Sequence, residues 1–273
     1  MKRIICFLII VLCIFAFASC KQEPEHEHTY SGDWTSDEIN HWHVATCEHT
    51  DEVADKAEHT WDAGTDDGNG KMVYKCTVCE KTKTEYKTYA IGTAGPAGGL
   101  IFYDCDADNE SGNADGLTSS ECGWRYLETT ATDLESPYIC FGYYRESDEA
   151  SNKVVGTSQG IGAGKENTEK LVAAMGDEVY SKSDGSDKTD NYAAKFCNNY
   201  SAGGKDDWFL PSMEEVELMY TNLHQKELGG FGWTYCSSSE KNEYLVYAKV
   251  FQTGLSTDLS RKNTGTVRPV RSF

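Results

Sequence analysis

The sequence predicts an α+β protein in two parts, a small module rich in histidine and cysteine and a larger mixed domain. Near the end of the chain a helix signal precedes several short strand signals, which is the order of an α+β domain. Six of the seven histidines fall much earlier, between residues 26 and 59. These observations divide the chain into a module at about 28–85 and a domain at 86–273.

The helix signal begins at Ser212. Ser212 and Glu215 have the S-x-x-E spacing of a capping box, and Pro211 suits the start of a helix. The apolar residues that follow recur at helical spacing, and they are Val216, Met219, Tyr220 and Leu223. A helix is therefore expected to start here and to bury one face.

Strands and two more helices are expected around this element. Residues 244–251 and 100–103 are aromatic and β-branched runs bounded by turn residues, as is typical of strands. Residues 168–175 and 192–197 have apolar side chains at helical spacing. The larger domain is thus expected to contain both kinds of element.

Three ordered motifs in this domain resemble a known family. They are W-x-L-P-S-x-x-E at 208–215, an aromatic-x-S-S-S-E strand at 235–240 and V-R-P-V-R-x-F at 267–273. They are similar to the C-terminal domain family of a collagen-like bacterial adhesin, which is related to C-type-lectin-like and formylglycine-generating-enzyme folds. The resemblance implies a C-type-lectin-like fold. Because that scaffold hosts sugar binding, protein binding and catalysis, it does not select one function.

The N-terminus has the pattern of an export signal. Lys2 and Arg3 precede an apolar run at 4–18 that is too short for a transmembrane helix. Its end, Phe17-Ala18-Ser19-Cys20, resembles a relaxed, spirochaete-type lipoprotein signal. We expect a signal peptide at 1–19, lipidation of Cys20 and a tether at 20–27, so that the protein is exported and anchored at the outer membrane or cell surface. The alternative is a secreted protein with an incidental Cys20.

The net charge excludes one class of partner. Removal of Lys2 and Arg3 with the signal would leave 23 basic residues against 44 acidic ones, a net charge of about −21. Such a chain repels polyanions, so nucleic acid is not an expected partner.

The small module carries candidate zinc ligands in an internal repeat. Each half has one histidine, His28 or His59, followed 17 to 19 residues later by a C-x-H or C-x-x-C pair. The candidate ligands for a structural zinc are Cys47, His49, Cys76, Cys79, His28 and His59. His41 and His43 compete with the last two, and a disulfide between Cys76 and Cys79 is the alternative.

An acidic segment after residues 100–103 has the spacing of a calcium loop. Its candidate oxygen ligands are Asp104, Asp106, Asp108, Glu110 and Asp115. Because Asn109 stands where such a loop has glycine, a solvated acidic turn is an equal alternative. Cys105 and Cys122 flank this segment and are the expected disulfide. The partners of Cys140, Cys197 and Cys236 stay open, since five cysteines cannot all pair.

The expected function is binding outside the cell. The chain would be a lipid-anchored, adhesin-type protein that recognises a glycan or a host or environmental protein. Its candidate ligand-binding residues are Trp233, Tyr235, Tyr244 and Tyr247. The alternatives are an enzyme of the formylglycine-generating type, for which Cys236 lacks the second cysteine, and a structural envelope lipoprotein. Arg261, Arg268 and Arg271 are expected either in a basic patch or in internal ion pairs.

Overall fold

The computed structural model describes residues 26–49, 51–107, 116–134, 138–142, 154–177, 179–180, 188–189 and 191–273. The chain divides into two compact units, Met1–Asp62 with Lys75–Thr82, and Ala63–Tyr74 with Lys83–Phe273. Both helices and sheets are present, so the protein is α+β. Residues 63–74, which the sequence placed in the small module, belong to the second unit.

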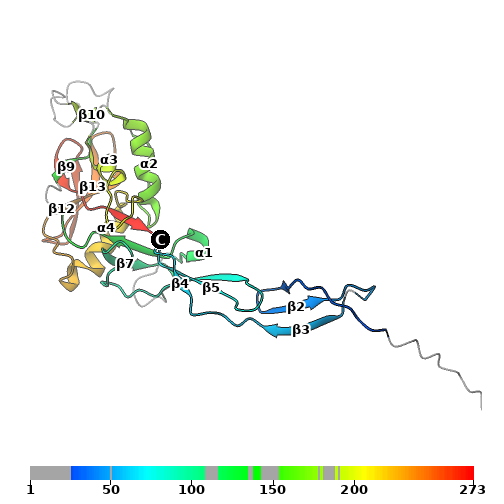
Figure 1. The fold of residues 1–273 in the computed structure, drawn as a ribbon. Coiled ribbons are helices and arrows are strands. Elements are labelled where there is room, and N and C mark those ends of the chain that lie inside the picture. The colour runs from blue at the N-terminus through cyan, green and yellow to red at the C-terminus, as the bar shows by residue number, and fades with distance from the viewer. Residues whose placement is uncertain are drawn as a thin grey trace, which may run out of the picture. The chain divides into compact units, whose positions relative to one another are not determined.

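Two successive three-stranded sheets have the same strand order, and Figure 1 labels their strands β2 to β5. The first consists of β1 (Thr35–Ser36), β2 (Asn40–Val44) and β3 (Val53–Glu58), and the second of β4 (Thr65–Asp66), β5 (Lys71–Lys75) and β6 (Thr82–Tyr86). The turns between their first two strands are closed alike. Asp37 Oδ1 accepts from the N–H groups of Ile39 and Asn40, and Asp67 Oδ1 accepts from those of Asn69 and Lys71. The internal repeat is therefore also a structural repeat.

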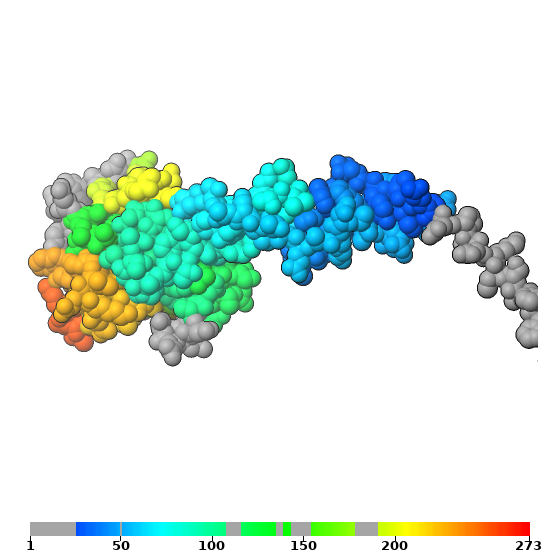
Figure 2. Space-filling model, turned by 60° about the horizontal axis from the view of Figure 1, so that its bottom comes forward, coloured from blue at the N-terminus to red at the C-terminus, as the bar shows by residue number. Residues whose placement is uncertain are grey.

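The remainder of the second unit has a five-stranded sheet, a three-stranded sheet and a short strand pair. In Figure 2 the residues of the second unit run from cyan through green and yellow to orange-red. The five-stranded sheet has the order β14-β13-β12-β15-β9 and the three-stranded sheet the order β16-β8-β7. The bounds are β7 Leu100–Asp104, β8 Tyr126–Thr129, β9 Tyr138–Cys140, β10 Val179–Tyr180, β11 Lys188–Thr189, β12 Thr234–Glu240, β13 Leu245–Val250, β14 Leu255–Ser260, β15 Thr264–Thr266 and β16 Val270–Ser272. β10 pairs with β11.

Helices join these sheets through two apolar clusters. The helices are α1 (Ser119–Cys122), α2 (Ala163–Met175), α3 (Ala193–Asn198), α4 (Met213–Asn222) and the 3-10 turn η3 (His224–Lys226). α2 and α3 contact each other and β12, whereas α4 contacts β12, β13 and β7. Leu171, Cys197 and Val246 belong to the first cluster, and Val216 and Phe251 to the second. α4 therefore packs against both sheets.

The start of α4 confirms the predicted capping box. The Ser212 hydroxyl accepts from the Glu215 N–H, and the Glu215 carboxylate accepts from the Ser212 N–H at 2.8 Å. Glu215 also accepts from the N–H groups of Gly162 and Gly164, at the start of α2. Val216, Met219 and Leu223 are buried as expected. Glu215 thus joins the starts of two helices.

The burial of Glu215 gives a pH-dependent prediction. Burial raises the pKa of Glu215 to about 7, although its N–H donors act in the opposite direction. Because the folded-state pKa is raised, the stability linked to this group is complete below pH about 4.5 and is lost as the pH rises through about 7. The loss should be roughly 3 kcal/mol. Urea unfolding at pH 4.5 and 8 should show a steeper decline for the wild type than for Glu215→Gln, and equal declines would contradict it.

The C-terminal arginines form internal ion pairs. Arg261 contacts Glu240 at 2.7 Å, Arg268 contacts Asp133 at 3.0 Å, and Arg271 contacts Glu128 at 3.1 Å. All three guanidinium groups are buried. The prediction of internal ion pairs is therefore confirmed for these residues, and they do not form a basic surface patch.

Candidate metal centres

Four side chains of the first unit form a cluster near its N-terminal segment. They are His26, His28, Cys47 and His49, and their potential ligand atoms lie within 4.8 Å of one another. His26 and His28 lie two residues apart on an extended segment, and Cys47 and His49 have the same spacing after β2. Tyr30 and Ala45 form a β-bridge beside them. This bridge holds the two pairs side by side, and the cluster could hold a metal ion.

A second cluster contains His41, His59, Cys76 and Cys79, again with all ligand atoms within 4.8 Å. His41 lies on β2 and His59 directly follows β3. The two cysteines come from the turn after β5, where the Cys76 N–H donates to the Lys81 carbonyl at 2.8 Å. His41 and Cys76 are buried, so this cluster is less exposed than the first.

The distances within both clusters fit tetrahedral coordination. His28 Nδ1 lies 3.4 Å from Cys47 Sγ, and His59 Nδ1 lies 3.4 Å from Cys79 Sγ. His41 Nδ1 lies 3.9 Å from Cys76 Sγ. Zinc bonds of about 2.0 Å to nitrogen and 2.3 Å to sulfur, at a tetrahedral angle, require a separation of about 3.5 Å between the two ligands. The side chains are thus already spaced for one small cation in each cluster.

Neighbouring groups prepare the second cluster for a metal. The Nε2–H of His59 donates to the Asp37 carbonyl at 3.0 Å, which leaves Nδ1 to face Cys79 as a lone-pair donor. Burial would raise the pKa of Cys76, but hydrogen bonds from the N–H groups of Cys79 and Val78 act in the opposite direction, and the pKa is lowered to about 6. The thiolate, which is the form that binds metals, is therefore favoured at neutral pH.

The two clusters also share a scaffold. The Thr46 hydroxyl donates to the Thr29 carbonyl at 3.1 Å, and the Thr77 hydroxyl donates to the Thr60 carbonyl at the same distance. Both bonds span 17 residues. Each bond fixes a histidine-bearing segment against the segment that carries its cysteine partner. His28 lies 19 residues from Cys47 and His59 lies 20 residues from Cys79, so the two histidine–cysteine contacts have similar spacing around this repeated bond.

The structure brings together all six predicted ligands and adds two. Cys47, His49 and His28 fall in the first cluster, and Cys76, Cys79 and His59 in the second. Sequence reasoning missed His26, which it assigned to the tether, and left His41 and His43 as competitors of His28 and His59. The H-x-H spacing of His26 and His28, which matches the C-x-H spacing of Cys47 and His49, was the available signal.

His43 lies outside both clusters. Its Nδ1 contacts the Asp33 carbonyl at 3.1 Å, and its ring lies 3.9 Å from that of Trp34, measured between centroids. Because β2 alternates its side chains between two faces, His41 and His43 would share a face in a regular strand. A register shift between them, in the pairing of β2 with β3, accompanies their different surroundings.

The described part of the predicted calcium loop does not support a calcium site. Both carboxylate oxygens of Asp104 accept from Arg125, at 2.9 and 3.0 Å. Asp106 accepts from the backbone and the hydroxyl of Ser119, at 2.7 and 2.6 Å. The Arg125 guanidinium therefore already neutralises the Asp104 carboxylate. The other predicted ligands, Asp108, Glu110 and Asp115, lie outside the described residues, as does Cys20.

The predicted aromatic binding face is not a continuous surface. Tyr235 is only 1 % exposed, and its hydroxyl donates to Asp133 at 2.8 Å. Tyr244 and Tyr247 are half-buried, and Trp233 is 52 % exposed. Tyr235 is therefore a core residue, and its assignment to a ligand surface was wrong.

All eight cysteines among the described residues are thiols in this structure. The Cys105 thiol donates to the Trp124 carbonyl at 3.2 Å. Burial and then the nearby charges of Asp106 and Cys122 raise the pKa of Cys105 to about 12. Cys105 and Cys122 are thus neighbours, and their disulfide stays a prediction for the oxidised protein.

No protein-family model matches the chain, and neither does any curated protein. A solved structure of a fimbrial protein from Bacteroides ovatus is similar at a TM-score of 0.38 and 12 % identity. The match covers 88 % of this chain and 65 % of that one, so the chain spans under two-thirds of the fimbrial protein. Within the described ranges, no helix combines the length and the hydropathy needed to cross a membrane.

Proposed function

We propose that the chain is an exported, lipid-anchored surface protein whose first unit is held together by two structural zinc ions. The observation that carries this proposal is the pair of four-residue histidine and cysteine clusters. Four protein ligands saturate a tetrahedral zinc ion, whereas a catalytic zinc keeps one position for water or substrate. The sites are accordingly assigned a structural role.

The first unit needs such a contribution because it buries few apolar side chains. Of the described apolar residues that are buried, only Ala45 and Cys76 belong to it. A small unit of this kind requires metals, disulfides or an association to stay folded. Two zinc ions would meet this need, since the free energy of metal binding is also free energy of folding.

The second unit is proposed to bind a glycan or protein ligand on a C-type-lectin-like scaffold. The capped helix α4 followed by β12 to β16 supports this reading, because these elements carry the three motifs of the family resemblance. The cysteines favour binding over oxygen-dependent catalysis. Burial, with Cys140 nearby, raises the pKa of Cys236 to about 12, and burial also raises the pKa of Cys197 and Cys140. Such thiols are poor metal ligands and nucleophiles.

Metal content is the first test of the proposed function. Elemental analysis of the purified mature chain should give two zinc ions and no calcium per molecule, because eight zinc-type ligands are grouped in fours. A thiol count before and after chelation should show Cys47, Cys76 and Cys79 becoming reactive only when zinc leaves. A metal-free chain whose first unit is fully folded would contradict the proposal.

A further inference from the structure

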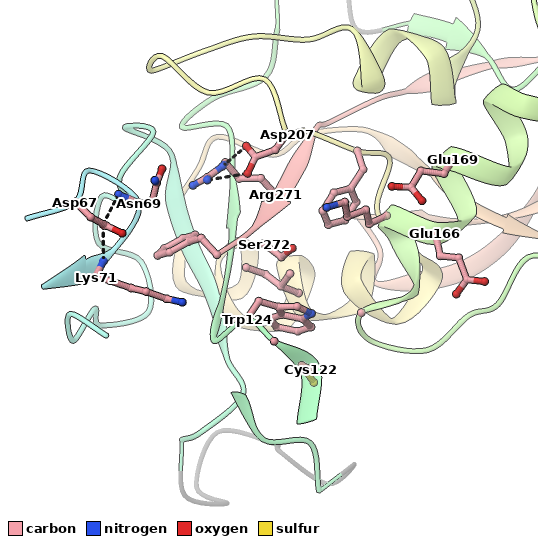
Figure 3. Close-up of a pocket in the computed structure, with 16 residues that line it drawn as sticks. Asp67, Asn69, Lys71, Cys122, Trp124, Glu166, Glu169, Asp207, Arg271 and Ser272 are labelled. Atoms are coloured by element: carbon pink, nitrogen blue, oxygen red, sulfur yellow. Dashed lines mark hydrogen bonds and ion pairs between the residues drawn. The ribbon is translucent and has the colours of Figure 1, made fainter. Parts of the chain in front are cut away.

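A cleft of about 750 Å³ opens on the second unit, away from the aromatic residues that the sequence suggested (Figure 3). The turn between β4 and β5 forms one wall and carries Asp67, Asn69 and Lys71. The first turns of α2 form the facing wall with Lys165 and Glu169. Pockets that bind small molecules have volumes of about 300–1,000 Å³, so the cleft has room for a compact ligand.

Trp124 supplies an aromatic surface between the two walls (Figure 3). Its indole is half-buried and lies 6.1 Å from the Tyr103 ring, measured between centroids. A β-carbon at Gly162 would come within 3.1 Å of the indole Cζ2 atom, and Gly162 has φ +85°. Tyr103 and Gly162 therefore fix the ring in place, and its orientation does not have to be ordered when a ligand binds.

The turn wall is also held rigidly within the second unit. A β-carbon at Gly70 would lie 2.4 Å from the Phe273 ring, so the turn packs directly on that ring. Lys205 donates to the side-chain oxygen of Asn69. Asp67 Oδ1 accepts from the N–H groups of Asn69 and Lys71, at 2.7 and 3.0 Å. The wall is thus preformed.

Charges of both signs line the cleft. Arg271 lies within it but is neutralised by Asp207, at 2.7 and 2.9 Å, and by Glu128. Lys165 and Glu169 are exposed on successive turns of α2, and Lys71 faces them from the other wall. A polyanion would meet the carboxylates, and a polycation would meet the ammonium groups. A neutral ligand with many hydroxyl groups can use both kinds of group as hydrogen-bond partners.

We propose that this cleft binds a neutral oligosaccharide, with one sugar face stacked on Trp124 and its hydroxyl groups bonded to the two polar walls. An aromatic platform bordered by hydrogen-bonding side chains of mixed sign matches the apolar face and polar rim of a sugar ring. The inference rests on the proposed ligand-binding role of the second unit and assigns that role a site and a ligand class.

The test is calorimetric titration of the full mature chain with four uncharged disaccharides: cellobiose, lactose, N,N′-diacetylchitobiose and mannobiose. A sulfated heparin disaccharide serves as the charged comparison. At least one uncharged disaccharide should bind and the sulfated one should bind more weakly. Trp124→Ala should weaken binding about tenfold, as expected for the loss of a central aromatic contact. Trp233→Ala discriminates the cleft from the aromatic residues that the sequence suggested, because Trp233 is exposed and does not line the cleft, so binding should be unchanged if the cleft is the site.

Glu169→Ala provides a second variant at an exposed helical position, where the fold should tolerate the change. It should weaken binding severalfold, and Glu227→Ala, an exposed glutamate elsewhere, should not. Failure of all four uncharged disaccharides, preference for the sulfated probe, or unaltered binding by a folded Trp124→Ala chain would each overturn the inference. If all four uncharged disaccharides fail to bind, a content of two zinc ions per chain would still support the proposed function of the first unit. If Trp233→Ala alone loses binding, the ligand site lies at Trp233 and the ligand-binding role of the second unit is retained.

Discussion

Chelation of zinc is expected to unfold the first unit and to leave the second unit folded. Each zinc site should contribute on the order of 10 kcal/mol to the folding of the residues that form it. The first unit has no other stabilising core of comparable size, since Ala45 and Cys76 are its only buried apolar residues among those described. Hydrogen exchange resolved along the chain should show loss of protection at 28–62 and 75–82 after chelation.

Two histidines on β2 provide a matched pair for this prediction. His41→Asn should lower the zinc content from two ions to one, because His41 belongs to the second cluster. His43→Asn should leave two ions, because His43 contacts Trp34 and Asp33 instead. Equal zinc loss in both variants, or unchanged protection after complete chelation, would contradict the structural role of the metal.

Glu128→Gln is expected to destabilise the second unit by about 3–5 kcal/mol, the usual cost of breaking a buried ion pair on one side. The Glu128 carboxylate is fully buried on β8. It accepts from Gly99 N–H at 2.7 Å, from Ala97 N–H at 3.1 Å and from Arg271 at 3.1 Å. The NH₂ group of a glutamine would face the N–H donors that the carboxylate now accepts from. Arg271 would keep only its ion pair with Asp207.

Urea unfolding followed by tryptophan fluorescence should measure this loss as a lower transition midpoint at an unchanged slope. Glu227→Gln is the control, because it makes the same change at an exposed glutamate of the same unit. If both variants unfold at the same urea concentration, Glu128 does not have the stabilising role that its contacts indicate.

Local signals predicted the elements of the second unit well. The capping box at Ser212 and Glu215 needs only residues three apart, so it could be recognised without a structure. The strands at 100–103 and 244–251 were predicted from aromatic and β-branched runs bounded by turn residues, the helix at 168–175 was predicted from helical spacing, and each corresponds to an observed element. The order of strands in the two sheets depends on long-range pairing, which no local pattern encodes.

The candidate metal centres were predicted in part for the same reason. Each half has one histidine followed 17 to 19 residues later by a C-x-H or C-x-x-C pair, and this identified six of the eight ligands. Spacing could not decide between His41 or His43 and the competing His28 and His59, because the surroundings of His41 depend on the pairing of β2 with β3. The calcium prediction gains no support at Asp104 and Asp106, because Arg125 and Ser119, more than ten residues away, contact their oxygens. Spacing cannot reveal such distant competitors.

His41 links the two sequence repeats in a way that bears on how such proteins evolve. It belongs to the earlier repeat but completes the ligand set whose cysteines, Cys76 and Cys79, stand in the later one. If this segment were duplicated in tandem, the new copy would contain its own threonine hydrogen bond. Its metal site would take one histidine ligand from the preceding copy. Chains of different lengths could therefore arise by gene duplication without the invention of a new interface.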